Sequence, residues 1–148
     1  LSVADWLALV TAIATVVGVF VVWLQTGKLE KQLFLQHFSD YTKRYQEIML
    51  NFPEDVNSPS FVLESSKDYE RTMRHMRAYL DLCYEEWYLD KRGFIDKATW
   101  DVWRGGIETA LSKSAFQQAW EVIRVTSRFG SEFEQFVAQC IGNSSKRT

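Results

Sequence analysis

Residues that commonly bind metals or act as nucleophiles are scarce in this chain. Two histidines and two cysteines occur among its 148 residues. His37 and His75 belong to no H-E-x-x-H motif, and neither lies at metal-ligand spacing from Cys83 or Cys140. No phosphate loop occurs, because Gly105–Gly106 follows no strand pattern and precedes no G-K-[ST]. The sequence therefore predicts no enzymatic activity, no metal site, no cofactor and no small-molecule substrate.

An excess of positive charge is also absent. The formal net charge is -2 and the pI is about 5.7, so the chain lacks the basic surface that nucleic-acid binding needs. We expect no nucleic-acid partner. The two cysteines are expected to be reduced and buried if the domain is cytoplasmic, and a disulfide between them is the alternative.

Charge is missing entirely from one long run near the N-terminus, Trp6–Leu24. At about 1.5 Å per residue, its roughly nineteen residues cover about 28 Å, close to the ~30 Å hydrocarbon core of a bilayer. The run predicts a transmembrane helix within residues 1–27, with a short outer N-terminus. A cleaved signal peptide is the alternative, but neither a basic segment before the run nor an A-x-A-like site after it supports one.

The residues that flank the run predict how it is anchored and oriented. Trp6 and Trp23 stand where indole rings favour the membrane interface, and Lys28 and Lys31 follow the run on one side only. Asp5 is the only charged side chain before the run. The positive-inside rule then predicts a single-pass protein of the inner (cytoplasmic) membrane, with its N-terminus outside and its C-terminal domain in the cytoplasm.

Small residues recur within and just before the run, many of them at four-residue intervals. This spacing lets two membrane helices approach closely, so it predicts a face that docks on other integral-membrane subunits. The alternative is that alanine is simply common in membrane spans. The predicted docking face consists of Ala4, Ala8, Ala12, Ala14 and Gly18.

Beyond the run, residues 28–142 predict a cytoplasmic all-α domain, an antiparallel bundle of about four to five helices. Apolar residues recur there in alternating steps of four and three, which is the period of a helix face, and no strand pattern occurs. Both prolines lie in a loop predicted at 51–64, and 143–148 is a predicted flexible tail. The two longest stripes are Phe34, Phe38, Tyr41, Tyr45, Ile48 and Phe52, then Tyr69, Met73, Met76, Leu80, Cys83 and Trp87.

Capping residues and glycines predict where the later helices begin and end. Ser65 and Ser66 are expected to cap the helix of the second stripe, and Gly93 is expected to follow its last turn. Asp96 is expected to cap a shorter helix. Gly105–Gly106 are expected to end that helix early or to press its backbone against a neighbour.

The helix of the second stripe carries many charges between its apolar positions. They are typical of a solvated helix face, and a surface that docks a partner is the alternative. Two adjacent glutamates on a helix point about 100° apart and are poorly placed as a catalytic pair. The candidate partner surface comprises Arg71, Arg74, Arg77, Glu85 and Glu86.

Several motifs occur between Tyr79 and Trp120: a Cys-x-Glu-Glu-x-Tyr-like run, a Lys-x-Gly-x-Ile turn, a Trp-x-x-Trp-x-x-Gly helix and a Phe-x-x-x-Trp ending. Their residues are Cys83, Glu85, Glu86, Trp87 and Tyr88, then Lys91, Gly93 and Ile95, then Trp100, Trp103 and Gly106, and finally Phe116 and Trp120. With these motifs the segment resembles an uncharacterised bacterial family of single-pass, membrane-anchored helical proteins. That family has no assigned activity or catalytic residues, so the resemblance implies the architecture alone.

Together these features predict a non-enzymatic accessory or structural subunit of an integral-membrane complex. Its membrane helix is expected to dock on other subunits, and its helical domain to cover part of their cytoplasmic face. A bioenergetic complex, respiratory or photosynthetic, is one host that fits. The alternative is a free-standing membrane-anchored module that recruits a soluble partner or signals through its helical domain. The expected partners are the lipid bilayer and other membrane subunits.

Overall fold

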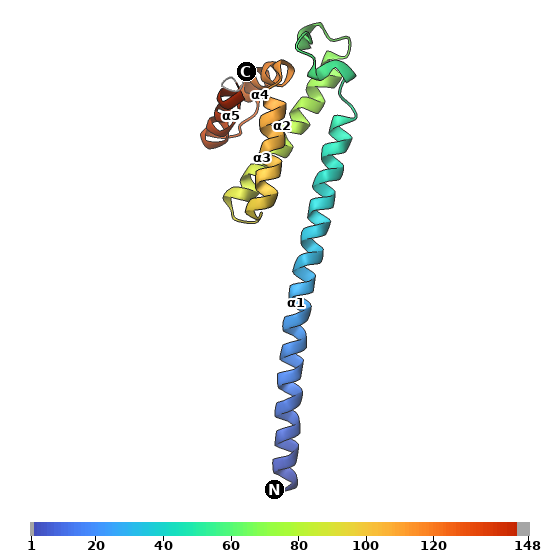
Figure 1. The fold of residues 1–148 in the computed structure, drawn as a ribbon, viewed down its shortest axis with the longest axis vertical. Coiled ribbons are helices and arrows are strands. Elements are labelled where there is room, and N and C mark those ends of the chain that lie inside the picture. Colours follow the sequence, from blue (N-terminus) through green and yellow to red (C-terminus); the bar gives the residue numbers. More distant parts are fainter. Residues whose placement is uncertain (1, 145–148) are drawn as a thin grey trace. The chain divides into compact units, whose positions relative to one another are not determined.

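The structure, a computed structural model, describes residues 2–144, without the side chains at positions 8, 9, 27, 30, 31 and 144. No strand occurs among the residues described, so the predicted all-α class is confirmed. The chain divides into two compact units, Leu1–Arg44 and Tyr45–Thr148. Its helices (Figure 1) are α1 (Val3–Met49), η1 (Glu54–Asn57) and η2 (Leu63–Ser65), both short 3-10 helices, α2 (Tyr69–Lys91), α3 (Lys97–Leu111), α4 (Ser114–Thr126) and α5 (Ser131–Ser144).

The N-terminal unit consists of α1 as far as Arg44. The helix passes through Gly27 without a break. Its part Val3–Thr26 is long and apolar enough to cross a membrane, and none of the side chains described there is buried. An apolar helix that buries so little of itself within its own chain needs lipid or another apolar partner around it.

The polar side chains at the start of α1 are satisfied within the helix itself. Ser2 Oγ donates to Asp5 Oδ2 over 2.8 Å and accepts from the Asp5 backbone N–H over 3.3 Å. Thr11 Oγ1 and Thr15 Oγ1 donate to carbonyl oxygens four residues back, over 2.8 and 2.9 Å. This internal pairing satisfies the hydroxyls without a partner outside the helix.

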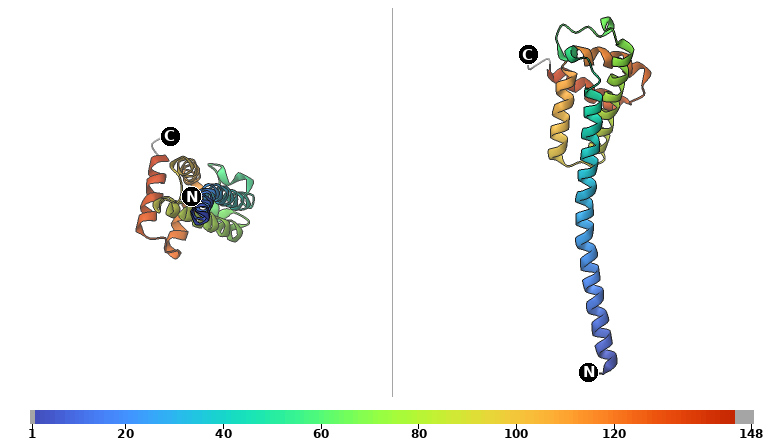
Figure 2. Two further views of the ribbon diagram at one scale, coloured as in Figure 1. Left: turned by 90° about the horizontal axis from the view of Figure 1, so that it is seen from below. Right: turned by 90° about the vertical axis from the view of Figure 1, so that its right-hand side faces the viewer.

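The C-terminal unit is built around one apolar core to which α2, α3, α4 and α5 all contribute. Figure 2 shows these helices packed together from two further directions. The predicted stripe on α2 is confirmed as a buried face from Met73 to Trp87. In the other predicted stripe Phe34, Phe38 and Tyr45 are exposed, and Ile48 and Phe52 are partly buried against the core. The core consists mainly of Met73, Met76, Leu80, Cys83 and Trp87 from α2, Trp100, Ile107 and Leu111 from α3, Phe116, Trp120 and Ile123 from α4, and Phe133, Phe136, Val137 and Cys140 from α5.

Phe133 of α5 lies at the centre of an aromatic cluster in this core, and its side chain is fully buried. Its ring centroid lies 5.2 Å from that of Tyr84 and 5.4 Å from that of Trp87. The rings of Phe129 and Phe136 lie 5.3 and 5.9 Å away. Offset and edge contacts at such distances add to the free energy gained by burying the rings. Phe133 is therefore the residue on which the packing of α5 depends most.

α2 begins at Tyr69, later than the sequence indicated. Ser65 ends η2 and Ser66 follows it in an extended conformation, so neither caps α2. The predicted caps are wrong because η2 is held against the core. Leu63 is buried there at 1% exposure, and its backbone N–H donates to Gln118 Oε1 over 3.2 Å. The chain can start α2 only after this anchored turn.

The end of α2 agrees with its prediction from Gly93. The Gly93 N–H donates to the Asp90 carbonyl over 2.9 Å, and the Phe94 N–H donates to the Leu89 carbonyl over 2.9 Å. This pair of bonds is a Schellman motif, which needs a left-handed residue after the helix. Gly93 supplies it with φ +70°.

Asp96 caps α3 as predicted. Its Oδ1 accepts from the Thr99 N–H over 3.0 Å, and its Oδ2 accepts from Thr99 Oγ1 over 2.7 Å. These hydrogen bonds favour the charged carboxylate and hold the pKa of Asp96 below its ordinary value. Because the folded-state pKa is the lower one, the cap stabilises the fold at neutral pH and loses this contribution as the pH falls through that lowered pKa.

α3 continues through Gly105 and Gly106 to Leu111, so the expected interruption is wrong. A Cβ added at either glycine would meet nothing within 4 Å, so no neighbour presses against the backbone there. Glycine costs a helix only about 1 kcal/mol relative to alanine. Burial of Ile107 and Leu111 on the core outweighs the roughly 2 kcal/mol that two glycines cost, because each fully buried side chain of this kind contributes roughly 1.5–3 kcal/mol.

Two alanine substitutions are expected to have opposite effects on stability. Gly105→Ala adds a Cβ in open space within α3 and should raise the free energy of unfolding by roughly 0.5–1 kcal/mol. Gly93→Ala puts a Cβ on a residue with φ +70° and should lower it by roughly 1–2 kcal/mol. Urea unfolding followed by circular dichroism measures both. Shifts of the same sign would contradict these roles.

Candidate binding cleft

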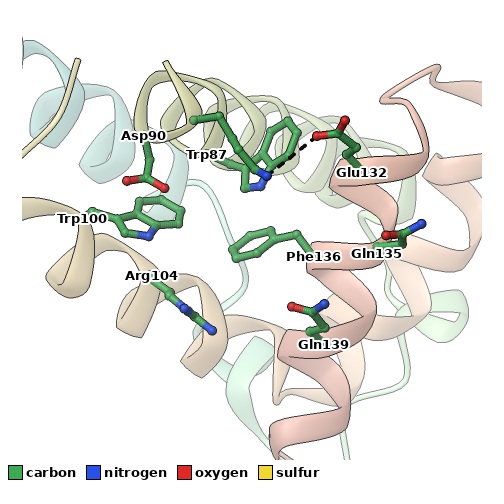
Figure 3. A pocket seen from close by; sticks show the side chains of 9 residues that line it. Trp87, Asp90, Trp100, Arg104, Glu132, Gln135, Phe136 and Gln139 are labelled. Carbon is green, nitrogen blue, oxygen red and sulfur yellow. Dashed lines mark ion pairs between the residues drawn. The ribbon is translucent and has the colours of Figure 1, made fainter. Parts of the chain in front are cut away.

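An open cleft lies between α2, α3 and α5 in the C-terminal unit (Figure 3). Its volume is about 480 Å³. That value falls within the range of roughly 300–1,000 Å³ typical of small-ligand sites. Three aromatic rings form its floor, and charged and amide side chains form its rim. The cleft is therefore a candidate binding site of this unit.

Each of the three helices contributes one ring to the floor: Trp87 from α2, Trp100 from α3 and Phe136 from α5 (Figure 3). The centroid of the Phe136 ring lies 6.5 Å from that of Trp87 and 5.8 Å from that of Trp100. The three side chains are only 8–9% exposed, because they also belong to the core. Core packing thus fixes the rings that the cleft presents.

One side of the rim contains an ion pair above the floor. Lys91 Nζ lies 3.8 Å from Glu132 Oε2 (dashed in Figure 3) and 5.6 Å from the centroid of the Trp87 ring. Gln135 and Gln139, on the same face of α5 as Glu132, add two amides. The Lys91 ammonium thus makes both an ionic contact and a cation–π contact at the edge of the cleft.

The other side of the rim contains a carboxylate, Asp90, and a guanidinium, Arg104. Asp90 is half-buried, and its carboxylate points towards the Trp100 ring (Figure 3). Among the residues described, its side chain makes no ion pair and no hydrogen bond. Arg104, also on this side, is already paired, because its Nε donates to Glu108 Oε1 over 3.0 Å. Asp90 is therefore available to a ligand.

The cleft was not predicted from the sequence, although part of its signal is visible there. Trp87 and Trp100 were identified as members of motifs, and the steps of three and four from Glu132 to Gln135 and Gln139 place polar residues on one helix face. Nothing in these spacings indicates that α2 and α3 meet α5. The cleft exists only where the three helices pack together.

The predicted interface anchors are exposed on α1. Trp6 is 57% exposed and Trp23 is 69% exposed, and the Trp23 ring stacks on Phe20 at a centroid distance of 6.0 Å. Lys28 is exposed as well. The side chain of Lys31 lies outside the described residues. Their role at a membrane surface stays a prediction.

The predicted docking face also lies on an exposed part of α1. Ala4, Ala12, Ala14 and Gly18 are all exposed, whereas the side chain of Ala8 lies outside the described residues. A Cβ added at Gly18 would meet nothing within 4 Å. This face is thus sterically open, and its docking on another membrane helix stays a prediction.

Glu86 does not belong to the exposed face on which the partner surface was predicted, because it is buried at 8% exposure. Residues seven apart share a helix face, and Glu86 follows the buried Thr72 and Tyr79 at this interval. Glu85 is half-buried. The exposed members of the predicted surface are Arg71, Arg74 and Arg77.

Both cysteines are buried and form no disulfide with each other, as predicted. Burial raises the pKa of the Cys83 thiol well above its ordinary value, and it raises the pKa of Cys140 to about 11. Both therefore stay protonated at neutral pH, and neither is poised as a nucleophile. Among the residues described, no group of three or more His, Cys, Asp and Glu side chains is placed to hold a metal ion.

Comparisons with protein-family models, with curated proteins and with solved structures give no match to this chain. The resemblance of Tyr79–Trp120 to a bacterial family therefore stays a prediction. What the protein does has to be inferred from its own residues.

Proposed function

We propose that this protein is a non-enzymatic accessory subunit of an integral-membrane complex. α1 crosses the bilayer and docks on other membrane helices, and the C-terminal unit, an antiparallel helical bundle, covers part of their cytoplasmic face. The observation that supports this most is the apolar surface of Val3–Thr26, which none of the described residues of the chain buries. Such a surface is stable only against lipid or apolar protein.

The distribution of side-chain size around α1 supports docking rather than anchoring alone. At about 100° per residue, Ala8, Ala12 and Gly18 lie on one side of the helix, and Ile13 and Val17 lie on the opposite side. Small side chains on one side allow another helix to approach closely there. The large side chains opposite them suit contact with lipid tails.

The distribution of charge around the span supports the proposed orientation. Asp5 precedes the apolar run, whereas the cations that follow it closely are Lys28, Lys31, Lys43 and Arg44. Cytoplasmic segments next to a span carry the excess of lysine and arginine. The C-terminal unit is therefore proposed to lie in the cytoplasm.

Native electrophoresis after extraction in a mild detergent tests the proposal. The protein is expected to migrate with other membrane proteins, which mass spectrometry identifies. Replacing Ala8, Ala12 and Gly18 by leucine should release most of it as a monomer, because the larger side chains separate the helices. Migration of the unsubstituted protein as an isolated monomer would contradict the proposal.

A matched control separates docking from general effects on the span. Ile13→Leu with Val17→Leu changes the opposite side of α1 and conserves its apolar character. This variant is expected to migrate with the complex as the unsubstituted protein does. Loss of the complex in both variants would mean that no particular face of α1 does the docking.

The cleft supports a second candidate, a free-standing anchored module that recruits a soluble partner. Its aromatic floor and charged rim have the composition of a recognition site. For such a module the three leucine substitutions in the span should change neither membrane retention nor partner capture. That result would favour the second candidate over the first.

A further inference from the structure

The cleft between α2, α3 and α5 takes no part in the docking proposed for α1. We propose that it binds a quaternary ammonium group, such as that of choline and related small organic cations. Its aromatic rings would contact the methyl groups, and its uncompensated carboxylate would balance the charge. The C-terminal unit would thus bind a ligand of its own, whichever complex hosts the protein.

The position of Lys91 shows that the cleft accommodates an ammonium group. Its Nζ lies 5.6 Å from the centroid of the Trp87 ring and 3.8 Å from Glu132 Oε2. The chain thus places its own cation against one ring and one carboxylate of the cleft. Tryptophan gives the strongest cation–π contact of the aromatic side chains. A ligand cation in the same cleft would meet the same chemistry.

The charges around the cleft favour a cation over an anion or a neutral ligand. Four charged residues line the cleft, two cations and two carboxylates. Both cations are already paired, Lys91 with Glu132 of the lining and Arg104 with Glu108 outside it. Among the residues described, Asp90 is the carboxylate of the lining without an ion pair. Charge complementarity of this kind selects the sign of the ligand.

A quaternary ammonium suits the cleft better than a primary one. The methyl groups of a quaternary ammonium contact the rings in place of water. They also donate no N–H hydrogen bonds, so the ligand needs no acceptors on the floor of the cleft, which has none. Lys91 can leave to admit it, because its side chain is 55% exposed and it is the last residue of α2. The ligand would then take the place of the Lys91 ammonium beside Trp87.

Calorimetric titration of the full-length protein with choline tests the proposal. The chain is held in nanodiscs of phosphatidylglycerol, which carry no choline. Saturable binding of choline is expected. The neutral isostere 3,3-dimethylbutan-1-ol, which has the same shape without the charge, should bind at least about fivefold more weakly. Equal binding of the two, or no saturable binding of choline, would overturn the proposal.

Charge substitutions at the rim locate the binding. Asp90→Asn should weaken choline binding about fivefold, because it removes the uncompensated carboxylate. Asp81→Asn makes the same change on α2 outside the cleft and should leave binding unchanged. Lys91→Gln should strengthen binding, since it removes the competing ammonium. Thermal unfolding at the same Tm as the unsubstituted protein verifies that each variant is folded. Unchanged choline binding in Asp90→Asn would overturn the proposal.

The ammonium group has two possible sources, a free molecule or the headgroup of a lipid. Repeating the titration in nanodiscs of phosphatidylcholine distinguishes them. If the headgroup reaches the cleft, binding of free choline should fall sharply in these nanodiscs. If the ligand is a free molecule, binding should be the same in both lipids.

Discussion

Two arginines placed in the apolar part of α1, Ile13→Arg and Val17→Arg, are expected to keep Val3–Thr26 out of the membrane. Each arginine near the centre of a span costs roughly 2.5–3.5 kcal/mol, so the pair costs about 5–7 kcal/mol. The ten valine, leucine and phenylalanine residues that remain in the span return about 0.3–0.6 kcal/mol each, so about 3–6 kcal/mol together, which is less than the cost of the pair. Alkaline extraction of membranes measures the effect. The unsubstituted protein should stay in the pellet, and the variant should move to the supernatant.

The matched control carries the same two arginines outside the span. Gln32→Arg and Gln36→Arg have the same spacing on exposed positions of α1, beyond the apolar run. They should leave the protein in the membrane pellet, because lysine and arginine are favoured on the cytoplasmic side of a span. Retention of the Ile13→Arg, Val17→Arg variant in the pellet would contradict a membrane-spanning role for α1.

Phe133→Ala is expected to be the most destabilising single substitution in the C-terminal unit. It removes a fully buried ring that contacts the rings of Tyr84, Trp87 and Phe129. Such a change costs about 3–5 kcal/mol, because the cavity cannot close completely. For a unit of this size the Tm should fall by more than about 12 °C. Thermal unfolding followed by near-UV circular dichroism measures the change.

Phe94→Ala is the matched control for Phe133→Ala. It removes the same side chain from the turn between α2 and α3, where Phe94 is 69% exposed. Its effect should stay within about 0.5 kcal/mol, as for other exposed positions. If the two variants had similar Tm values, Phe133 would not hold the central place in the core that its contacts indicate.

The helices of this protein were predictable because their buried faces repeat in the sequence. The stripe from Met73 to Trp87 forms the inner face of α2, and Asp96 caps α3 where the sequence placed the cap. Both features are local: a helix face has a period, and a cap needs only its own first turn. Sequence periodicity therefore predicts most of the helices of the C-terminal unit.

The errors arose where packing outweighed local preference. Gly105 and Gly106 do not break α3, because burial of residues on either side of them exceeds the cost of two glycines. Ser65 does not cap α2, because η2 is tied to the core. Glu86 is charged but lies on a buried face. Each of these outcomes depends on contacts between helices. The spacing of residues in the sequence does not predict such contacts.

The candidate site was the least predictable feature. Its three rings lie in three helices, and its rim joins Asp90 of α2 to Glu132 of α5 across more than forty residues of sequence. The sequence placed Trp87 on an apolar helix face and Trp100 in a motif, and all three rings also belong to the core. Only the packing of α3 and α5 against the end of α2 turns them into the floor of a cleft.

Labelling from one side of the membrane tests the central claim, that α1 crosses the bilayer and leaves the C-terminal unit in the cytoplasm. Ser2→Cys and Ser65→Cys place single thiols on exposed positions before and after the span, while Cys83 and Cys140 are buried and react slowly. A membrane-impermeant maleimide should label Ser2→Cys in intact spheroplasts and Ser65→Cys only after lysis. Labelling of both positions before lysis, or of neither, would contradict the claim.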